Sequence, residues 1–281
     1  MSCGQHESLS ENTSMASMVC TTLCQWRAIM PGSVLIIGAG ILQVPLICEA
    51  QSLGLFVIVT DGNPEAPGFV IADAYYAIDT YGTRGHVELV EYLALTDKAH
   101  RLCGVVTAGA DVAPTVATAA KAAGVRGIPV DVAERTHNKA KVRACLSLHD
   151  LSCYQPEWLT FKTMMADEDH RIGYPCVVKP LSQRASRGIS LVYDASELQI
   201  AIKKVLAYGE EYLIEQCLVG TEHSIEGIFG DDGLLVWWNV VDRIFDYSDG
   251  LAMEVGHINP TVLDAQTQQQ LLLMFLSSAK A

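Results

Sequence analysis

Short apolar runs alternate with helical segments along the first half of the chain, from Ser33 to Arg135. The runs "VLIIG", "LFVIVTD", "AYYAID" and "LCGVVTAG" are typical of strands buried on both faces, because such strands carry near-continuous apolar sequence. Segments such as "GHVELVEYLALTD" and "DVAPTVATAAKAAG", the second with Asp111 as a candidate N-cap, have the pattern of helices. This alternation predicts a parallel, doubly wound sheet, which is an α/β fold.

The carboxyl ends of these strands are where a doubly wound sheet binds its ligands. One of them, "GAGILQ", resembles the G-x-G-x-x-G turn of dinucleotide-binding domains, and the acidic residue Asp61 ends the next strand. Gln43 stands in place of the third glycine, which would keep the helix from packing closely on the strand. An NAD(P)-dependent oxidoreductase that uses turn 38–43 is therefore one alternative function.

The second half of the chain has a different pattern. A helix is predicted to begin near Asn138, followed by the extended segment "CYQPEWLTF", the strands "YPCVVKP" and "GISLVYD", a helix and the strand "YLIEQCL". These form an α+β subdomain. The segments "EHSIEGIFG", "GLLVWWNVVDR" and "LAMEVGHINP" then read as antiparallel strands, and Asp264 is a candidate N-cap for a last helix.

Composition excludes several classes of protein. The chain has 281 residues and a formal net charge of −13, which argues against nonspecific binding of nucleic acid. Its nine cysteines show no paired CxxC spacing and no secretory leader precedes them, so we expect reduced thiols in the cytoplasm. The longest apolar candidate, "SVLIIGAGILQVPLI", contains turn glycines, and no run reaches the ~18 residues of a membrane span.

An ordered series of polar residues in the second half fits the chemistry of ATP. Lys139 and Lys179 are point donors that can neutralise phosphate charge, and a loop over 182–188 with Arg187 can close on the phosphates and exclude water. The strand end 215–218 can offer its backbone to the adenine edge, and Glu222 can accept from ribose hydroxyls. No single one of these residues is specific for ATP, but their order along the chain is typical of an ATP site.

With these residues in view, the chain resembles the ATP-grasp superfamily from about Ser33 to its end. "NKAKVR" is similar to the family's D-K-x-x-x-R/K helix start, with Asn138 replacing Asp. "GYPCVVKP" resembles its G-[YF]-P-x-[VI]-[VI]-K-P strand, "SRGI" its loop end, and "YLIEQCLVGTEHSIEG" its hinge and ribose segment. The resemblance is strongest to the carbamoyl-phosphate-synthase-like and L-amino-acid-ligase-like branches.

The sequence predicts four segments. Three of them follow from the resemblance: a Rossmann-like pre-ATP-grasp domain over 33–135, a small α+β subdomain with its linker helix over 136–219, and the start of an incomplete C-terminal subdomain over 220–281. The fourth, a flexible tail over 1–32, is predicted from its polar, Ser- and Thr-rich composition. The nucleotide-binding residues that the resemblance implies are Lys139, Lys179, Ser186, Arg187, Gly188, Glu215, Gln216, Cys217, Leu218 and Glu222.

The resemblance also implies an activity. It is ADP-forming ligation, in which ATP with Mg²⁺ activates a small carboxylate as an acylphosphate for attack by an amine. It implies no nucleic-acid or membrane partner, and allows a homodimer. Catalytic residues are not identified.

One family feature is not found in this sequence. The family's magnesium ligands lie in a later E-x-N-P-R strand, whereas "HINPT" has His257 and Thr261 at the acid and arginine positions. We instead read "EVGHINP" as the family's E-x-G-H-x-x-P segment, which makes Glu254 and His257 structural or substrate-proximal residues. We expect no metal ligand within these residues and an ATP-grasp fold truncated at the C-terminus. A nonenzymatic or degenerate ATP-binding protein is the second alternative function.

Overall fold

The computed structural model describes residues 32–96, 101–149, 155–165, 171–183, 187–209, 211–230, 232–246 and 253–280. The chain divides into two compact units, Met1–Glu134 and Arg135–Ala281. The boundary between these two units falls one residue before Arg135, the predicted end of the Rossmann-like domain. Each unit is described by itself.

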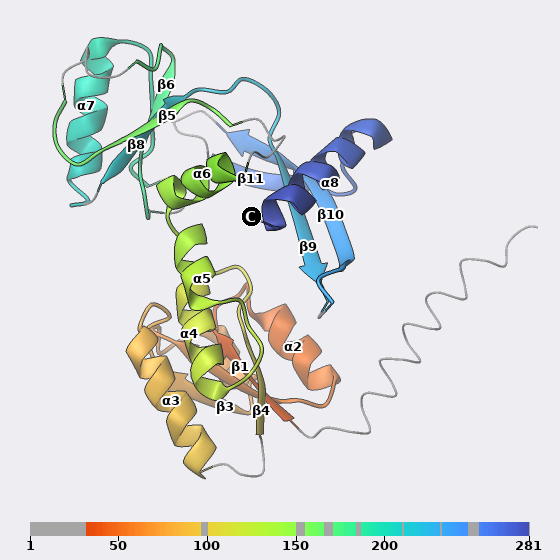
Figure 1. The fold of residues 1–281 in the computed structure, drawn as a ribbon. Helices are drawn as coiled ribbons and strands as arrows, with labels where there is room; N and C mark the ends of the chain where they lie inside the picture. Colours follow the sequence, from red (N-terminus) through yellow and green to blue (C-terminus); the bar gives the residue numbers. More distant parts are fainter. Residues whose placement is uncertain are drawn as a thin grey trace, which may run out of the picture. The chain divides into compact units, whose positions relative to one another are not determined.

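The sheet of the first unit has four parallel strands. They are β1 (Gly32–Ile37), β2 (Phe56–Asp61), β3 (Ala74–Ala77) and β4 (Arg101–Val106), in the order β3-β2-β1-β4 (Figure 1). The predicted parallel sheet is confirmed.

Helices bury both faces of this sheet. On one face Val34, Ile36 and Val59 pack with Ile47 of α2 (Val44–Ser52). On the other, Leu35 and neighbouring side chains pack against α3 (Thr83–Thr96) and α4 (Ala113–Ala123). Since successive residues of a strand point to opposite faces, burial of both faces explains the continuous apolar runs.

Two local predictions in this region need correction. The N-cap of α4 is Val112, which makes no side-chain cap bond, so the predicted cap at Asp111 is wrong. The sequence reading also missed the helix α5 (Val130–Thr136), which is seven residues long and too short to show a clear apolar period.

The second unit contains a four-stranded antiparallel sheet. Its strands are β5 (Trp158–Phe161), β6 (Cys176–Pro180), β7 (Ser190–Val192) and β8 (Tyr212–Gln216), in the order β5-β8-β6-β7. The helix α7 (Ala195–Leu206) covers one face, where Leu198 and Ile202 pack on Val178 and Ile214. The strand alternation therefore turns Lys179 of β6 and Glu215 of β8 to the opposite face.

A second, three-stranded sheet follows in the same unit. It consists of β9 (His223–Phe229), β10 (Leu235–Asp246) and β11 (Met253–Ile258), all antiparallel as predicted. The last helix, α8 (Ala265–Ala279), begins at the predicted cap, because the Asp264 side chain accepts hydrogen bonds from the backbone of Gln266 and Thr267. The predicted subdomain boundary at residues 219 and 220 lies between β8 and β9 and stays a prediction.

The buried carboxylate of Asp242 fixes the segment before α8 to this sheet. It accepts from Thr261 Oγ1, from the Val262 amide at 2.8 Å, and from His223 Nδ1 at 2.8 Å. The Thr261 hydrogen bond is the largest cause of the lowered pKa of Asp242. The side chain thus works as a structural acceptor within β10.

Among the described residues, no helix is both long enough and apolar enough to cross a membrane.

The buried side chain of His86 makes the stability of the first unit dependent on pH. Nδ1–H of His86 donates to the Gly82 carbonyl at 2.9 Å, so Nε2 accepts from Thr60 Oγ1 at 2.9 Å and the imidazole is neutral. Burial lowers the pKa of His86. The unfolded chain takes up this proton near pH ~6.5, while the folded chain does so only at lower pH.

We therefore expect the free energy of unfolding to fall as the pH drops below about 6.5, with a contribution from His86 of up to ~1.4 kcal/mol per pH unit. Urea unfolding followed by circular dichroism between pH 7.5 and 5 should show a flatter profile for His86→Gln. His149→Gln, which changes an exposed histidine, is the control and should keep the wild-type profile. Equal slopes for His86→Gln and wild type would contradict the prediction.

Candidate nucleotide-binding site

Three charged side chains meet on the face of the four-stranded sheet that α7 leaves open. Glu215 lies in the centre, with Lys179 Nζ bonded to its Oε1 and Arg143 Nη2 donating to its Oε2 at 3.1 Å. The side chain of Glu215 is 9% exposed, that of Lys179 16% and that of Arg143 25%. Because the three groups are partly buried, salt and water screen their charges only weakly. The cluster has a net charge of one positive unit, which suits an anionic ligand.

Arg143 reaches this cluster from α6 (Lys139–Leu148). The side chain of Asn138 caps that helix by accepting from the Lys141 amide at 3.0 Å. The predicted helix start at Asn138 is thus confirmed, and Asn takes over the capping role of an Asp at this position. Arg143 follows Lys139 by four residues, which places both side chains on one side of the helix.

The other predicted phosphate ligand, Lys139, is directed at the start of the 182–188 loop. Its Nζ donates to the carbonyl oxygens of Leu181 at 3.2 Å and Gln183 at 2.7 Å, and its amide also donates to Leu181 O. The ammonium therefore brings positive charge to the loop entrance by binding the loop backbone. The sequence could show the lysine but not these carbonyl partners.

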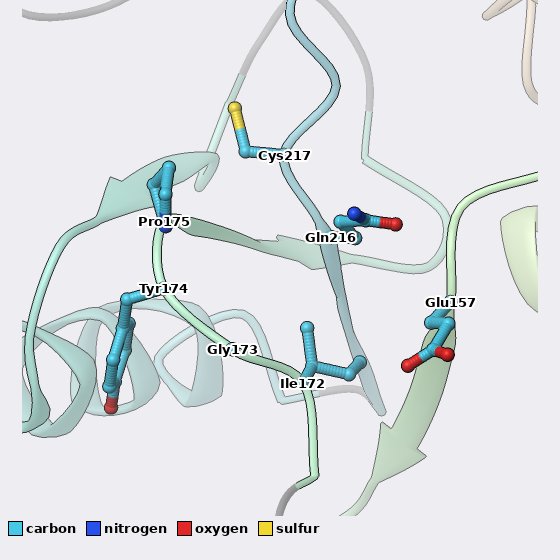
Figure 2. Close-up of a pocket in the computed structure, with 7 residues that line it drawn as sticks. All are labelled: Glu157, Ile172, Gly173, Tyr174, Pro175, Gln216 and Cys217. Atoms are coloured by element: carbon cyan, nitrogen blue, oxygen red, sulfur yellow. The ribbon is translucent and has the colours of Figure 1, made fainter.

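A pocket of about 270 Å³ lies beside the end of β8. Figure 2 shows its lining, which comes from the segment before β6, the end of β8 and the residue before β5: Glu157, Ile172, Gly173, Tyr174, Pro175, Gln216 and Cys217. The volume lies near the small end of ligand pockets and suits a single ring system better than a whole nucleotide.

Backbone hydrogen bonds on both sides hold the hinge 215–218 in place. The Gln216 amide donates to Glu157 O at 2.9 Å, and the Cys217 amide donates to Pro175 O at 3.2 Å. Two of the four predicted hinge residues, Gln216 and Cys217, line the pocket, whereas Glu215 turns its carboxylate to Lys179 and Leu218 is half-exposed.

Part of the predicted phosphate loop is outside the described residues, including Ser186. Arg187 is exposed, and Gly188 is buried with a φ of +74°. A Cβ at Gly188 would lie 2.7 Å from Tyr208 Cε2 and 3.1 Å from Pro180 Cγ. The loop end thus needs glycine both for its conformation and for its close packing.

Glu222, the predicted ribose ligand, belongs to a second charge cluster. Its Oε2 accepts from Arg243 Nη1 at 3.2 Å, and Arg243 also forms two hydrogen bonds to Glu254, at 2.6 and 2.9 Å. Hydrogen bonds from Arg243 lower the pKa of Glu254 to about 2. His257, which is half-exposed, has its Nε2 2.9 Å from Glu254 Oε1, so both polar residues of the "EVGH" segment belong to this cluster.

The Gly turn of the first unit is closed by side chains of the chain itself. The Ala39 amide donates to Asp61 Oδ2 at 2.8 Å, and the Gln43 side chain donates to Ala108 O. A dinucleotide site needs the turn amides for pyrophosphate and the acid for ribose. Here the amide and the acid are bonded to each other, so the geometry does not favour the NAD(P) alternative.

No group of three or more His, Cys, Asp or Glu side chains arranged to hold a metal occurs in the described part of the chain. Arg243 is bonded to both Glu222 and Glu254, and His257 lies 2.9 Å from Glu254, so a cation already occupies the space between these two carboxylates.

Comparison with known proteins agrees with this geometry. Residues 172–281 match a family model described as an ATP-grasp domain. This part of the chain is an ATP-grasp domain. A formate-dependent phosphoribosylglycinamide formyltransferase from a Sulfurovum species is 27% identical over 168 residues, which cover 59% of this chain and 42% of that protein.

Solved structures share the fold of this chain. An L-amino acid ligase from Bacillus licheniformis has a TM-score of 0.67 at 23% identity, over 89% of this chain and 60% of that one. An N5-carboxyaminoimidazole synthetase from Staphylococcus aureus, complexed with ADP, has a TM-score of 0.69 at 17% identity, over 88% and 63%. The chain spans less than two thirds of the length of the relatives it matches.

Two residue sets of this ATP-grasp site were missed by the sequence reading. Arg143 stood within the quoted "NKAKVR" motif, and its four-residue spacing from Lys139 was a usable signal. The pocket residues Glu157 and Ile172 had no such signal, because their role depends on strand neighbours far away in the sequence.

The packing of Gly188 gives a stability prediction with a matched control. Gly188→Ala should lower the free energy of unfolding by about 2–4 kcal/mol, because it combines a left-handed backbone with a steric clash. Gly209→Ala has a similar φ of +71° with no atom within 4 Å of the new Cβ, so it should cost only about 1 kcal/mol. Urea unfolding measures both. Equal losses for the two variants would show that the Tyr208 contact does not matter.

Proposed function

We propose that the chain binds ATP together with Mg²⁺ and uses it for ADP-forming ligation of a small carboxylate to an amine. The observation that carries the proposal is the position of the Lys179–Glu215–Arg143 cluster, whose first two residues lie on β6 and β8, the two strands that also border the base-sized pocket. A base in the pocket and phosphates at the cluster are the two ends of one nucleotide. The ATP-grasp domain over 172–281 supports the same ligand.

The chain's own residues would contribute binding and charge. The hinge at Gln216 and Cys217 would hold the adenine through backbone groups other than their two amides, which are bonded to Glu157 and Pro175. Glu222 would accept from the ribose through Oε1, since Oε2 is bonded to Arg243. Lys179 and Lys139 would face the phosphates, with the 182–188 loop excluding water. These groups position the nucleotide and offset the negative charge that develops during phosphoryl transfer.

Mg²⁺ is part of this proposal only as the ion that accompanies ATP. The described residues contain no cluster of three or more side chains that could hold the ion by themselves. When bound, the ion would neutralise charge on the phosphate oxygens.

The names of the relatives do not state that a carboxylate is activated as an acylphosphate, so this step is part of the proposal. The L-amino acid ligase and the formyltransferase are named for reactions of different substrates. The substrate pair therefore belongs to the proposal. A cytoplasmic location, which we expect because the cysteine pattern favours reduced thiols, and a homodimer also belong to the proposal, and fractionation and sizing experiments test them.

The nucleotide pocket can be tested by chemical protection. Cys217 lines the pocket, so Mg-ATP should slow its alkylation by N-ethylmaleimide, by at least about fivefold at saturation. Cys48 is exposed in the first unit and should react at the same rate with or without nucleotide, which provides a control in the same molecule. Mass spectrometry of both peptides measures the rates. Protection of Cys48 but not Cys217 would contradict the assigned pocket.

The ligase reaction can be tested by ADP release with pairs of amino acids. We expect release to depend on a carboxylate and an amine together, and to be reduced at least about a hundredfold in Lys179→Met, which removes a charge at the phosphates. Lys203→Met, on the exposed side of α7, is the matched control and should keep wild-type release. Tight Mg-ATP binding without ADP release from any pair would instead support the nonenzymatic alternative.

A further inference from the structure

The carboxylate of Glu215 has two cationic partners, and only one of them is a predicted phosphate ligand. We propose that Arg143 is a positioning residue that frees Lys179 for the nucleotide, by holding Glu215 when Lys179 turns to phosphate. The proposal rests on the proposed nucleotide site. It assigns to Arg143 an effect on ATP affinity without any contact to ATP.

The geometry gives each oxygen of Glu215 its own partner. Lys179 Nζ bonds to Oε1, and Arg143 Nη2 donates to Oε2 at 3.1 Å. Lys179 lies on β6 beside Glu215 on β8, while Arg143 comes from α6. Arg143 can therefore stay in place while the flexible lysine side chain moves.

The orientation of Arg143 is fixed by the start of its helix. The Lys139 amide donates to Leu181 O, and Asn138 caps the first turn. These bonds tie α6 to the end of β6, so Arg143 one turn later faces the sheet. Its side chain is only 25% exposed, which limits the screening of its charge by water.

Charge explains why Lys179 needs such a neighbour. With Lys179 alone, Glu215 would form a neutral buried pair that attracts phosphate weakly. A phosphate that captured Lys179 would then leave Glu215 as an unpaired buried anion beside another anion, which is strongly unfavourable. With Arg143 present the cluster keeps one net positive charge, and Glu215 stays paired after Lys179 has moved.

This role differs from that of an arginine that binds phosphate directly. If Arg143 only balances Glu215, then removing the charge of Glu215 as well should make Arg143 unnecessary. If Arg143 contacts the nucleotide or merely supports packing, the second substitution should not help. The pair of substitutions therefore separates the two roles.

The test measures Mg-ATP affinity by isothermal titration calorimetry for wild type, Arg143→Met, Glu215→Gln and the double variant. We expect Arg143→Met to bind about tenfold or more weakly, the order for losing one unit charge near a bound anion. Glu215→Gln is the reference for the double variant, which should bind within about threefold of Glu215→Gln because Arg143 then has no charge to balance. Wild-type affinity in Arg143→Met, or a double variant tenfold or more weaker than Glu215→Gln, would overturn the proposal.

A second measurement decides the proposal without ATP. Competitive labelling with acetic anhydride compares Lys179 with exposed Lys203 in the same molecule. Arg143→Met should slow the labelling of Lys179 by about threefold or more, since Glu215 then binds the ammonium alone, and the double variant should restore it.

Unchanged labelling of Lys179 in Arg143→Met would overturn the positioning role even if ATP binds. If wild type binds no Mg-ATP, the proposed function fails, while the labelling pattern still supports or overturns the role of Arg143. Circular dichroism and urea unfolding of each variant show whether a change in affinity reflects a loss of folding.

Discussion

The buried carboxylate of Glu215 joins three elements of the second unit through charge. It lies on β8, accepts from Lys179 of β6 and from Arg143 of α6, and is 9% exposed. A carboxylate this buried is tolerated only if both oxygens are paired with cations or donors. The pairing therefore determines where the lysine of β6 points and which side of α6 faces the sheet. The proposed phosphate site therefore depends on this anion being satisfied.

The pocket beside the cluster depends on backbone, and hence on strand order. The amides of Gln216 and Cys217 are bonded to the carbonyl oxygens of Glu157 and Pro175, which directly precede the two flanking strands β5 and β6. Side chains at these positions can vary without moving the hinge. Under the proposed function, this backbone-held pocket would take the base, and Lys179 would meet the phosphates.

Much of the fold was predictable because the pattern of apolar residues along the chain reflects which residues are buried. The central strands β1 and β2 are largely apolar because both of their faces are buried, whereas the edge strands β3 and β4 are partly exposed. The helices α6 and α8 begin at the side-chain caps Asn138 and Asp264. The misses have physical causes. The helix α5 is too short to show a period, and the α4 cap at Val112 makes no side-chain bond.

The site was predictable in its residue types but not in its pairings. Lys139 and Lys179 were found from their places at a helix start and a strand end. Their partners were not, because Glu215 lies 72 residues from Arg143, and Lys139 binds backbone carbonyls that any sequence could provide. The sequence shows which charges are available, whereas strand register decides which charges cancel.

The glycine turn shows a second limit of prediction from sequence, because its motif suggests a binding site that the geometry does not favour. "GAGILQ" and Asp61 have the spacing of a dinucleotide site, yet Asp61 accepts from the Ala39 amide and so satisfies the turn from within. An amide that is already bonded to a carboxylate cannot bind pyrophosphate without losing a charge-assisted bond. The same motif and spacing therefore occur both in a turn that binds a dinucleotide and in a turn that is bonded to its own acidic residue. What separates them is whether the acid at the end of the second strand points back to the turn or outward to a ligand.

The local positive charge of the cluster has to act against the charge of the whole chain. The net charge of −13 produces a field that repels a nucleotide polyphosphate at long range, although salt screens it beyond about 8–10 Å. Attraction must therefore come from partly buried cations within contact distance, where screening is weak. That requirement favours a lysine whose charge is not cancelled by its own neighbour, which is the condition that two cations around one carboxylate provide. The acidic surface and the cation pair thus form a consistent arrangement, in which selectivity for the anion is confined to the site itself.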